Sequence, residues 1–470
     1  MLAAMARGKV LALLLGPSGY GVAATIDQLV VTLAQVVQIA APFTAMKFLS
    51  LAHSDSDVAF TRVYRTFYRT FLPYAVSVSA CLALASPVWL PIAAPDLSAH
   101  MTAVAVALCA LPAAMIQAFL ASVLAARRAS VQSVGLLALT GVVVAVSAAV
   151  GGRWGVAGVY VASVPAWSLV VAGAAVMLRP AGRRDAVSPS MRALLQAQPA
   201  IVTTAIMGLL ALTTYGLLLF GVRYLTLSLQ GPAAAGLVQA ALATAMSLGA
   251  IVAPISSVWL APYLNRAIAP AEKVAAAHAF VCRLAVVLAV AGVAVTLVPD
   301  FVLQTLFSRE FIAASPLLVW FVLWQIYLQA AQAYQYLLVG LDDVIGGTTT
   351  IVFGHAVSIA CAALLAPAFG LVGAGMGFVL GAVASIASAL WRLRHQHGAS
   401  PTTALWRALG AAPLALAAAD ASWQVFHLDL AARVVLGLVL VVFLLMGLPL
   451  DDRKSLLHIW RTRWPGRRVP

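Results

Sequence analysis

One stretch near the N-terminus decides the fold, and it reads LALLLGPSGYGVAATIDQLVVTLAQVVQIAAPFTAMKFLS from Leu11 to Ser50. An apolar run ends at a turn rich in glycine, and a longer apolar run follows that carries Asp27, Gln28 and Lys47. Apolar segments of about 20 residues cross a bilayer as helices. Because lipid offers no hydrogen-bond partners, the polar side chains of the second run must face protein or water. The stretch therefore predicts two membrane helices with a polar side.

The composition of the whole chain indicates the same setting. Hydrophobic residues make up 63% of the chain and charged residues 9%, and the mean hydropathy is +1.01, which leaves too little polar surface for a water-soluble globule. The apolar runs lack strand-like alternation, which favours helices over a barrel. We expect an all-α polytopic membrane protein with about fourteen spans, at residues 2–15, 21–49, 71–94, 100–125, 131–150, 155–178, 197–220, 232–262, 283–306, 312–340, 345–367, 370–391, 404–420 and 431–450.

The basic residues predict the orientation of these helices. Lys and Arg in short loops stay on the cytoplasmic side. With the N-terminus inside, most loop arginines fall on that side, among them Arg62, Arg65 and Arg69, whereas the outer loops keep only a few, such as Arg223. This orientation accounts for most of the net charge of +14, so no nucleic-acid partner is expected. Both termini are predicted to be cytoplasmic.

Recurring landmarks indicate that the chain is a duplication. Three of them recur 215 residues later: Gly16-Pro17 as Gly231-Pro232, Gly155 as Gly370, and Gln117 as Gln332. Because this offset joins helices that enter the membrane in the same direction, the copies are predicted to be parallel repeats related by an axis along the membrane normal. The predicted domains are an N-terminal six-helix lobe at 1–178, a cytoplasmic linker at 179–196, a C-terminal six-helix lobe at 197–391, two additional helices at 392–450, and a basic cytoplasmic tail at 451–470.

Polar side chains form stripes on two of the predicted helices. Gln28 and Gln35 lie seven residues apart on one face of the second span. The tenth span carries a longer row, consisting of Gln325, Gln329, Gln332 and Tyr336. Such groups either join neighbouring helices by hydrogen bonds or line a water-filled cavity. A row over three helical turns favours the cavity.

A family resemblance adds a substrate. The residues that carry it are Gly8, Lys9, Leu11, Ala12, Gly16, Pro17, Gly19 and Gly21, followed by Gln28 and Lys47, and then VWLAPYLNR at 258–266 and DFVLQTLFSREFIAASPLLVWFVLWQIYLQ at 300–329. Over residues 8 to 395 the sequence resembles the Wzx-type oligosaccharide flippases, the polysaccharide-export branch of the MATE-like MOP superfamily, and most of all the translocases of O-antigen and enterobacterial common antigen. It departs from them in lacking most of the usual first helix and in carrying Asp27 where similar proteins tend to be basic.

The resemblance implies a flippase that moves undecaprenyl-diphosphate-linked oligosaccharide across the bacterial inner membrane for surface polysaccharide (O-antigen or exopolysaccharide) biosynthesis. It implies cations for the diphosphate, for which the candidates are Lys9, Lys47 and Arg65, and polar partners for the sugars in a central cavity, for which the candidates are Gln28, Gln35, Gln117, Gln325, Gln329, Gln332 and Tyr336. Lys47 and Arg65 have a second interpretation, as basic side chains that reach toward the cytoplasmic boundary. Asp27 is the candidate for ion coupling. The expected partners are membrane lipids and the polysaccharide polymerase and chain-length machinery; no cofactor, metal or catalytic residue is expected.

Other functions remain open. A MATE-type drug antiporter would share the fold and would use an acidic residue such as Asp27 as its cation site. A lipid II flippase would also share the fold, but its N-terminal signatures are absent. A membrane-embedded polysaccharide polymerase or glycosyltransferase would carry catalytic residues on a sizeable outer loop, and every predicted outer loop is short. Asp342-Asp343 is interpreted as a solvated turn and not as a metal pair.

Overall fold

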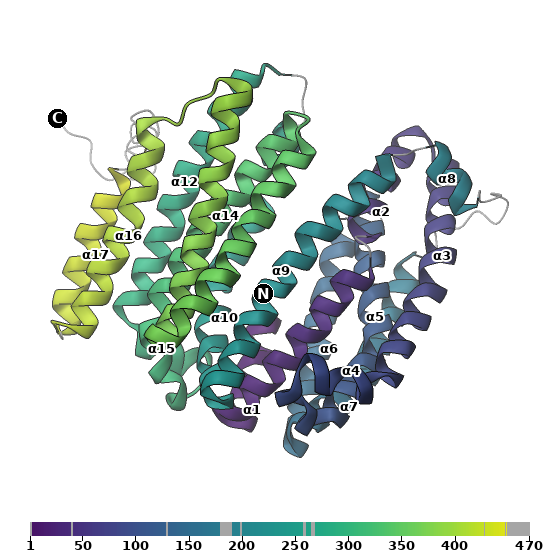
Figure 1. The fold of residues 1–470 in the computed structure, drawn as a ribbon, viewed down its shortest axis with the longest axis horizontal. Helices are drawn as coiled ribbons and strands as arrows, with labels where there is room; N and C mark the ends of the chain where they lie inside the picture. The colour runs from purple at the N-terminus through teal and green to yellow at the C-terminus, as the bar shows by residue number, and fades with distance from the viewer. Residues whose placement is uncertain are drawn as a thin grey trace, which may run out of the picture. The chain divides into compact units, whose positions relative to one another are not determined.

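The structure, a computed structural model, consists of helices throughout the part of the chain that it describes (Figure 1). It describes every residue except 1, 39–40, 128–129, 179–189, 198–199, 257–259, 265–267, 427, 447 and 449–470. Within these described residues, nine helical segments are long and apolar enough to cross a membrane. The all-α polytopic fold class predicted from the sequence is confirmed. The predicted tail at 451–470 and most of the predicted linker lie outside the described residues.

The chain forms two compact units, and the first consists of Met1–Gln239 together with Leu306–Phe311. Its helices are α1 (Leu2–Val37), α2 (Ala41–Asp55), α3 (Asp57–Leu84), α4 (Ser86–Ala93), α5 (Met101–Ala126), α6 (Ser130–Gly151), α7 (Gly155–Leu178), α8 (Met191–Ala197), α9 (Ala200–Gln230) and the start of α10 (Pro232–Ile255). Buried aromatic side chains fill its core, with Phe71 and Phe119 at a ring distance of 5.4 Å. Helix α1 packs against α5, α6, α7 and α9, so it runs through the middle of the unit.

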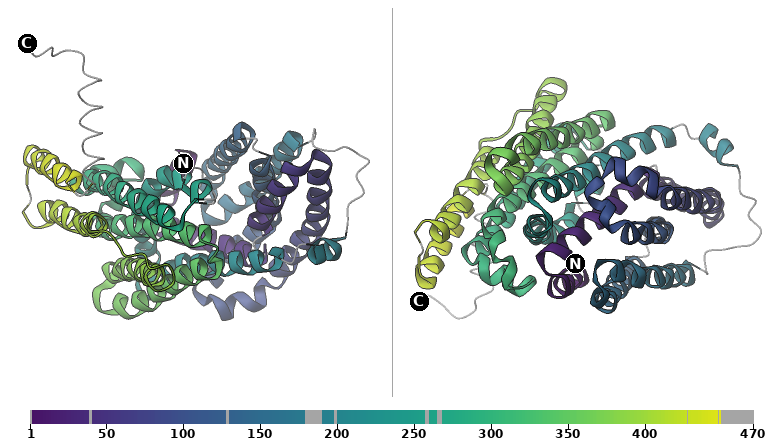
Figure 2. Two further views of the ribbon diagram at one scale, coloured as in Figure 1. Left: turned by 90° about the horizontal axis from the view of Figure 1, so that it is seen from above. Right: turned by 60° about the horizontal axis from the view of Figure 1, so that its bottom comes forward.

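The second unit contains Ala240–Thr305 and Ile312–Pro470. Its helices are the rest of α10, then α11 (Ala261–Leu264), α12 (Pro270–Leu297), α13 (Pro299–Leu306, whose last residue belongs to the first unit), α14 (Ser315–Gly340), α15 (Val344–His397), α16 (Thr403–Gln424) and α17 (Leu430–Leu445). Helix α14 is its centre and packs against α12, α15 and α16. Trp324 of α14 meets Phe378 of α15 edge-on at 4.9 Å. The last two helices, α16 and α17, lie side by side (Figure 2).

Four glycines with positive φ angles lie where helices break or end. They are the same glycines that recur at the 215-residue offset in the sequence. Gly16 and Gly231 have φ angles of 62° and 86°, and Gly155 and Gly370 have φ angles of 75° and 60°. This backbone region favours glycine because a side chain would be strained there. Gly16 and Gly370 each break a segment that is otherwise continuous helix. Each pair therefore shares its backbone conformation, as a duplication predicts, while the superposition of whole lobes stays a prediction.

The helical segments that follow Gly155 and Gly370 also approach the preceding helical segment in the same way. A Cβ atom on Gly158 would overlap the carbonyl oxygen of Gly151, and a Cβ atom on Gly373 would overlap that of Leu365. Glycine allows this close approach of two helix backbones, which is a common device in membrane bundles. The close contact thus occurs at two glycines that are 215 residues apart, as the predicted duplication requires.

Helices α1 and α10 cross with a reciprocal contact inside the first unit. A Cβ atom on Gly21 would overlap the carbonyl oxygen of Pro232, and a Cβ atom on Gly236 would overlap the carbonyl oxygen of Pro17. The two glycines are equivalent under the 215-residue offset, as are the two prolines. The crossing therefore has an internal two-fold character, and it brings the N-terminal turns of two equivalent helices together.

The segment Leu306–Phe311 joins the first unit through aromatic packing. Tyr20 of α1 lies 5.8 Å from the ring of Phe307 and 5.6 Å from that of Phe311, and both phenylalanines are almost fully buried. A short connection between α13 and α14 is thereby fixed to α1 just after its break at Gly16.

Three predicted spans have wrong boundaries for one physical reason. The spans predicted at 71–94, 197–220 and 283–306 stop short of Arg69, Arg223 and Lys273, which we interpreted as loop residues. In the structure α3 begins at Asp57, α9 continues to Gln230, and α12 begins at Pro270. The prediction that Arg223 lies in an outer loop is therefore wrong: it is on α9, and 5% of it is exposed.

Candidate functional site

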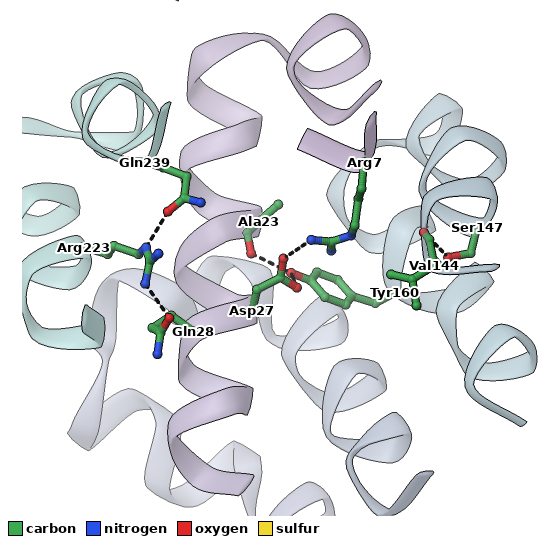
Figure 3. A network of polar contacts seen from close by, with 9 residues as sticks. All are labelled: Arg7, Ala23, Asp27, Gln28, Val144, Ser147, Tyr160, Arg223 and Gln239. Atoms are coloured by element: carbon green, nitrogen blue, oxygen red, sulfur yellow. Dashed lines mark hydrogen bonds and ion pairs between the residues drawn. The ribbon is translucent and has the colours of Figure 1, made fainter. Parts of the chain in front are cut away.

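A network of polar side chains surrounds α1 at the level of Asp27 and Gln28 (Figure 3). These two neighbours on the helix point in different directions. Asp27 is directed toward Arg7 and Tyr160, whereas Gln28 is directed toward Arg223. All the residues of the network belong to the first unit. Helix α1 thus separates two arginine sites with different partners.

Arg223 is a buried cation held by amides. Its Nε donates to Oε1 of Gln239 at 2.6 Å, and its Nη1 donates to Oε1 of Gln28 at 2.5 Å. Nη1 also lies 3.4 Å from the carbonyl oxygen of Leu219. Among the residues that the structure describes, no carboxylate forms an ion pair with Arg223. The guanidinium charge is therefore hydrogen-bonded but not neutralised.

Arg7 is the opposite case. Its Nη1 lies 2.7 Å from Oδ2 of Asp27, and the two side chains are 24% and 30% exposed. The hydroxyl of Tyr160 lies 3.0 Å from Oδ1 of Asp27 and 2.7 Å from the carbonyl oxygen of Ala23, so it fixes the carboxylate from the other side. In a straight helix, residues as far apart as Arg7 and Asp27 would be about 30 Å from each other. The break at Gly16 is what brings them together.

A second layer of contacts fixes Gln28. The amide nitrogen Nε2 of Gln28 lies 3.4 Å from the hydroxyl of Thr32, which in turn lies 3.0 Å from the carbonyl oxygen of Gly216 on α9. A Cβ atom on Gly216 would overlap Oε1 of Gln35. Because Gly216 has no side chain, α9 packs closely against the polar side of α1. The nitrogen of the Gln28 amide faces Thr32, and its oxygen accepts from Arg223.

The other predicted site residues of the first unit have separate places. Lys9 on α1 and Arg65 on α3 are half-buried, and Gln35 is half-buried beside α9. Gln117 is buried on α5, with its Nε2 at 3.4 Å from the hydroxyl of Thr140. Lys47 lies on α2, and its side chain is outside the described set. Of the predicted residues, Asp27 and Gln28 thus join the network, and the roles of all of them stay predictions.

The predicted stripe on α14 divides into two parts. Gln325 and Gln329 are buried, whereas Gln332 and Tyr336 are half-buried. The side chain of Gln325 packs on Gly249 of α10, where a Cβ atom would overlap it. The Oε1 atoms of Gln325 and Gln329 have no hydrogen-bond partner in the part of the chain that the structure describes. At Gln325 the geometry fits helix packing, and the cavity wall stays a prediction.

Sequence analysis missed four members of the network: Arg7, Tyr160, Arg223 and Gln239. Arg223 had a signal, because it is a lone arginine in the apolar run LLLFGVRYLTL at 217–227. An ionisable residue inside such a run is expected to face the protein interior. For Tyr160 and Gln239 the sequence alone offers no signal, since their role depends on which helices meet.

Metal binding finds no support among the described residues, which contain no group of three or more His, Cys, Asp or Glu side chains placed to hold an ion. Asp343 instead caps the N-terminus of α15, where its Oδ1 accepts from Gly346 at 2.8 Å, and its Oδ2 lies 3.0 Å from Nε of Arg392. This agrees with the interpretation of Asp342-Asp343 as a turn.

The chain is similar to known proteins in its structure, although not in its sequence. No protein-family model matches the sequence, and no curated protein matches it. An inward-facing multidrug resistance MATE family transporter of the MOP superfamily matches with a TM-score of 0.64 and 17% identity, over 84% of this chain and 94% of that one. The lipid II flippase MurJ in an inward closed conformation matches with a TM-score of 0.64 and 9% identity, over 94% and 95%. A MATE protein in a straight conformation gives a TM-score of 0.59 at 17% identity, over 84% and 94%. The chain therefore has a MATE-like fold.

Proposed function

We propose that this chain is a membrane flippase that moves undecaprenyl-diphosphate-linked oligosaccharide from the inner to the outer leaflet of the bacterial inner membrane. The sequence resemblance to Wzx-type flippases supports this substrate. The fold supports transport in general, because similar structures include both a lipid flippase and multidrug transporters. In this proposal the product feeds surface polysaccharide biosynthesis, and both termini are cytoplasmic.

The observation that carries the proposal is the buried, uncompensated charge of Arg223. Burying a cation without a carboxylate partner destabilises a protein by several kcal/mol, which favours a functional role for Arg223 over a purely structural one. Burying a diphosphate is also unfavourable, because its negative charges lose hydration inside a protein. A guanidinium presents parallel N–H groups that fit phosphate oxygens. Each charge therefore reduces the cost of burying the other.

The remaining candidates receive roles within the same proposal. Lys9, Lys47 and Arg65 are assigned to the diphosphate on its way to Arg223, and the predicted glutamines and Tyr336 are assigned to the sugars. Arg7 and Asp27 neutralise each other, and Asp27 is the candidate for ion coupling. The lipid tail stays in the bilayer. We expect neither nucleotide hydrolysis nor a cofactor, and the chain is not proposed to be an enzyme.

A second candidate is a MATE-type drug antiporter. Asp27 favours it, because a carboxylate in a membrane helix can hold a proton or a cation. The 2.7 Å contact between Asp27 and Arg7 weakens it, since that carboxylate is already neutralised. The polymerase or glycosyltransferase interpretation has less support, because the similar structures are transporters and flippases.

Complementation of a bacterial strain that lacks its own O-antigen flippase tests the proposal. Wild-type protein should restore long surface polysaccharide, and Lys9→Ala and Lys47→Ala should strongly reduce it at normal membrane levels. Asp27→Asn should be milder, because it removes a negative charge from a site for an anion. If Asp27→Asn abolishes activity while both lysine variants act normally, the antiporter is favoured and the proposal fails.

A further inference from the structure

The two side chains that hold Arg223 are amides, although carboxylates of the same length would fit the same places. Gln28 and Gln239 each present an Oε1 atom to the guanidinium, at 2.5 Å and 2.6 Å. A glutamate at either position would place a carboxylate oxygen there with no change in the length of the side chain. It would also give the buried cation a partner of opposite charge, whereas a buried charge without one is strongly destabilising. Glutamine at both positions therefore leaves the guanidinium without a carboxylate there.

Two successive residues of α1 contact arginines in different ways, one with a charged oxygen and the other with a neutral oxygen. Asp27 compensates Arg7 directly, with a charge-assisted contact of 2.7 Å. One residue further on, Gln28 serves Arg223 with a neutral oxygen (Figure 3). An amide oxygen accepts a hydrogen bond as a carboxylate does but carries no net charge. One arginine is therefore neutralised and the other is positioned with its charge intact.

The orientation of the Gln28 amide is also fixed. Its Nε2 is directed to the hydroxyl of Thr32, which is held against the carbonyl oxygen of Gly216. With the nitrogen occupied in this way, the oxygen faces Arg223. Gln28 is 8% exposed, so water does not replace this contact easily.

We infer that Gln28 and Gln239 are specificity-determining residues that keep the charge of Arg223 available and so select lipids with an anionic headgroup. This inference rests on the proposed function, in which the anion is the diphosphate of the lipid. The two glutamines act through Arg223 as positioning residues. A carboxylate at either place would occupy the guanidinium and exclude the diphosphate.

The test is lipid flipping by the full-length protein in phosphatidylethanolamine and phosphatidylglycerol vesicles. The probe is a fluorescent polyprenyl-diphosphate disaccharide, and the label in the outer leaflet is bleached by a membrane-impermeant reductant. Gln28→Glu and Gln239→Glu should each reduce flipping about tenfold or more while the unfolding temperature stays equal or rises. Gln28→Met, which is neutral and of similar size, should lose less activity than Gln28→Glu, because it adds no negative charge beside Arg223.

One control separates charge from packing. In an Arg223→Gln background, Gln28→Glu should cause no further loss, because the glutamate then has no guanidinium to occupy.

The outcomes distinguish the inference from the function. If Gln28→Glu and Gln239→Glu are folded and flip the lipid as the wild type does, the inference is wrong and the proposed function stands. An equal loss in Gln28→Met and Gln28→Glu would also overturn it, since the loss would then come from removing the amide and not from adding a negative charge. If the wild-type protein does not flip the anionic probe, the proposed function itself fails.

Discussion

Arg7 and Arg223 approach neighbouring residues of α1, Asp27 and Gln28, and differ in the charge of the side chains that they contact. Arg7 faces a carboxylate, and Arg223 faces two amide oxygens. The first arrangement resembles an ordinary structural ion pair, whose members contribute to holding α1 together across the break at Gly16. The second leaves a buried charge with no carboxylate in contact among the residues that the structure describes. At the residue scale, function is therefore expected at Arg223 and stability at Arg7.

A substitution at Tyr160 tests whether the site around Arg7 and Asp27 stabilises the protein. Tyr160→Phe removes the hydroxyl that lies beside both Asp27 and the carbonyl oxygen of Ala23, and we expect a loss of about 1 kcal/mol in the free energy of unfolding. Denaturant titration of the protein in detergent micelles measures it. Tyr64→Phe is the control, because Tyr64 packs by ring stacking on Phe60. An equal effect of both variants would contradict the role of the Tyr160 hydroxyl.

At the scale of helices, glycine decides where elements meet. Gly21 and Gly236 each leave room for a backbone carbonyl of the other helix. Gly21→Ala and Gly236→Ala should each lower the free energy of unfolding by about 2 kcal/mol, because the added methyl group forces α1 and α10 apart. The same substitution at Gly135 of α6 has open space around it and should be neutral or slightly stabilising, since alanine is the better helix former.

Thermal unfolding of the three glycine variants in parallel checks this. Stability of Gly21→Ala and Gly236→Ala equal to that of Gly135→Ala would mean that the crossing is not packed as described.

The same scale shows what could be predicted from the sequence and what could not. The helix breaks at Gly16 and Gly370 were predictable, because a glycine that recurs at a fixed offset indicates a backbone conformation that favours glycine. The ends of α3 and α9 were not, because a basic residue marks a loop in most membrane proteins, whereas here it lies within a helix. The network around α1 was predictable only in part: Asp27 and Gln28 lie in an apolar run, but nothing in the sequence pairs them with Arg7, Arg223, Tyr160 or Gln239.

At the scale of the whole chain, the predicted duplication is visible in the glycines with positive φ angles and not in the polar residues of the network. The positions equivalent to Asp27 and Gln28 in the second copy are Leu242 and Ala243, and the position equivalent to Arg223 in the first copy is Gly8. Only Gln117 and Gln332 remain alike among the predicted site residues. Among the network residues, Asp27 and Gln28 belong to the first copy of the predicted repeat, and Arg223 and Gln239 belong to the second. In the proposed function, this charged site and the amides of α14 suit a substrate with a charged end and a neutral sugar end.

The central claim is that Arg223 binds the diphosphate of the transported lipid. The most direct measurement is the binding of polyprenyl diphosphate and of the uncharged polyprenol to purified wild-type protein, Arg223→Lys and Arg223→Gln. We predict that the wild type prefers the diphosphate by about tenfold or more, that Arg223→Lys keeps part of this preference, and that Arg223→Gln binds both lipids equally. If folded Arg223→Gln retains the wild-type preference for the diphosphate, the claim is contradicted.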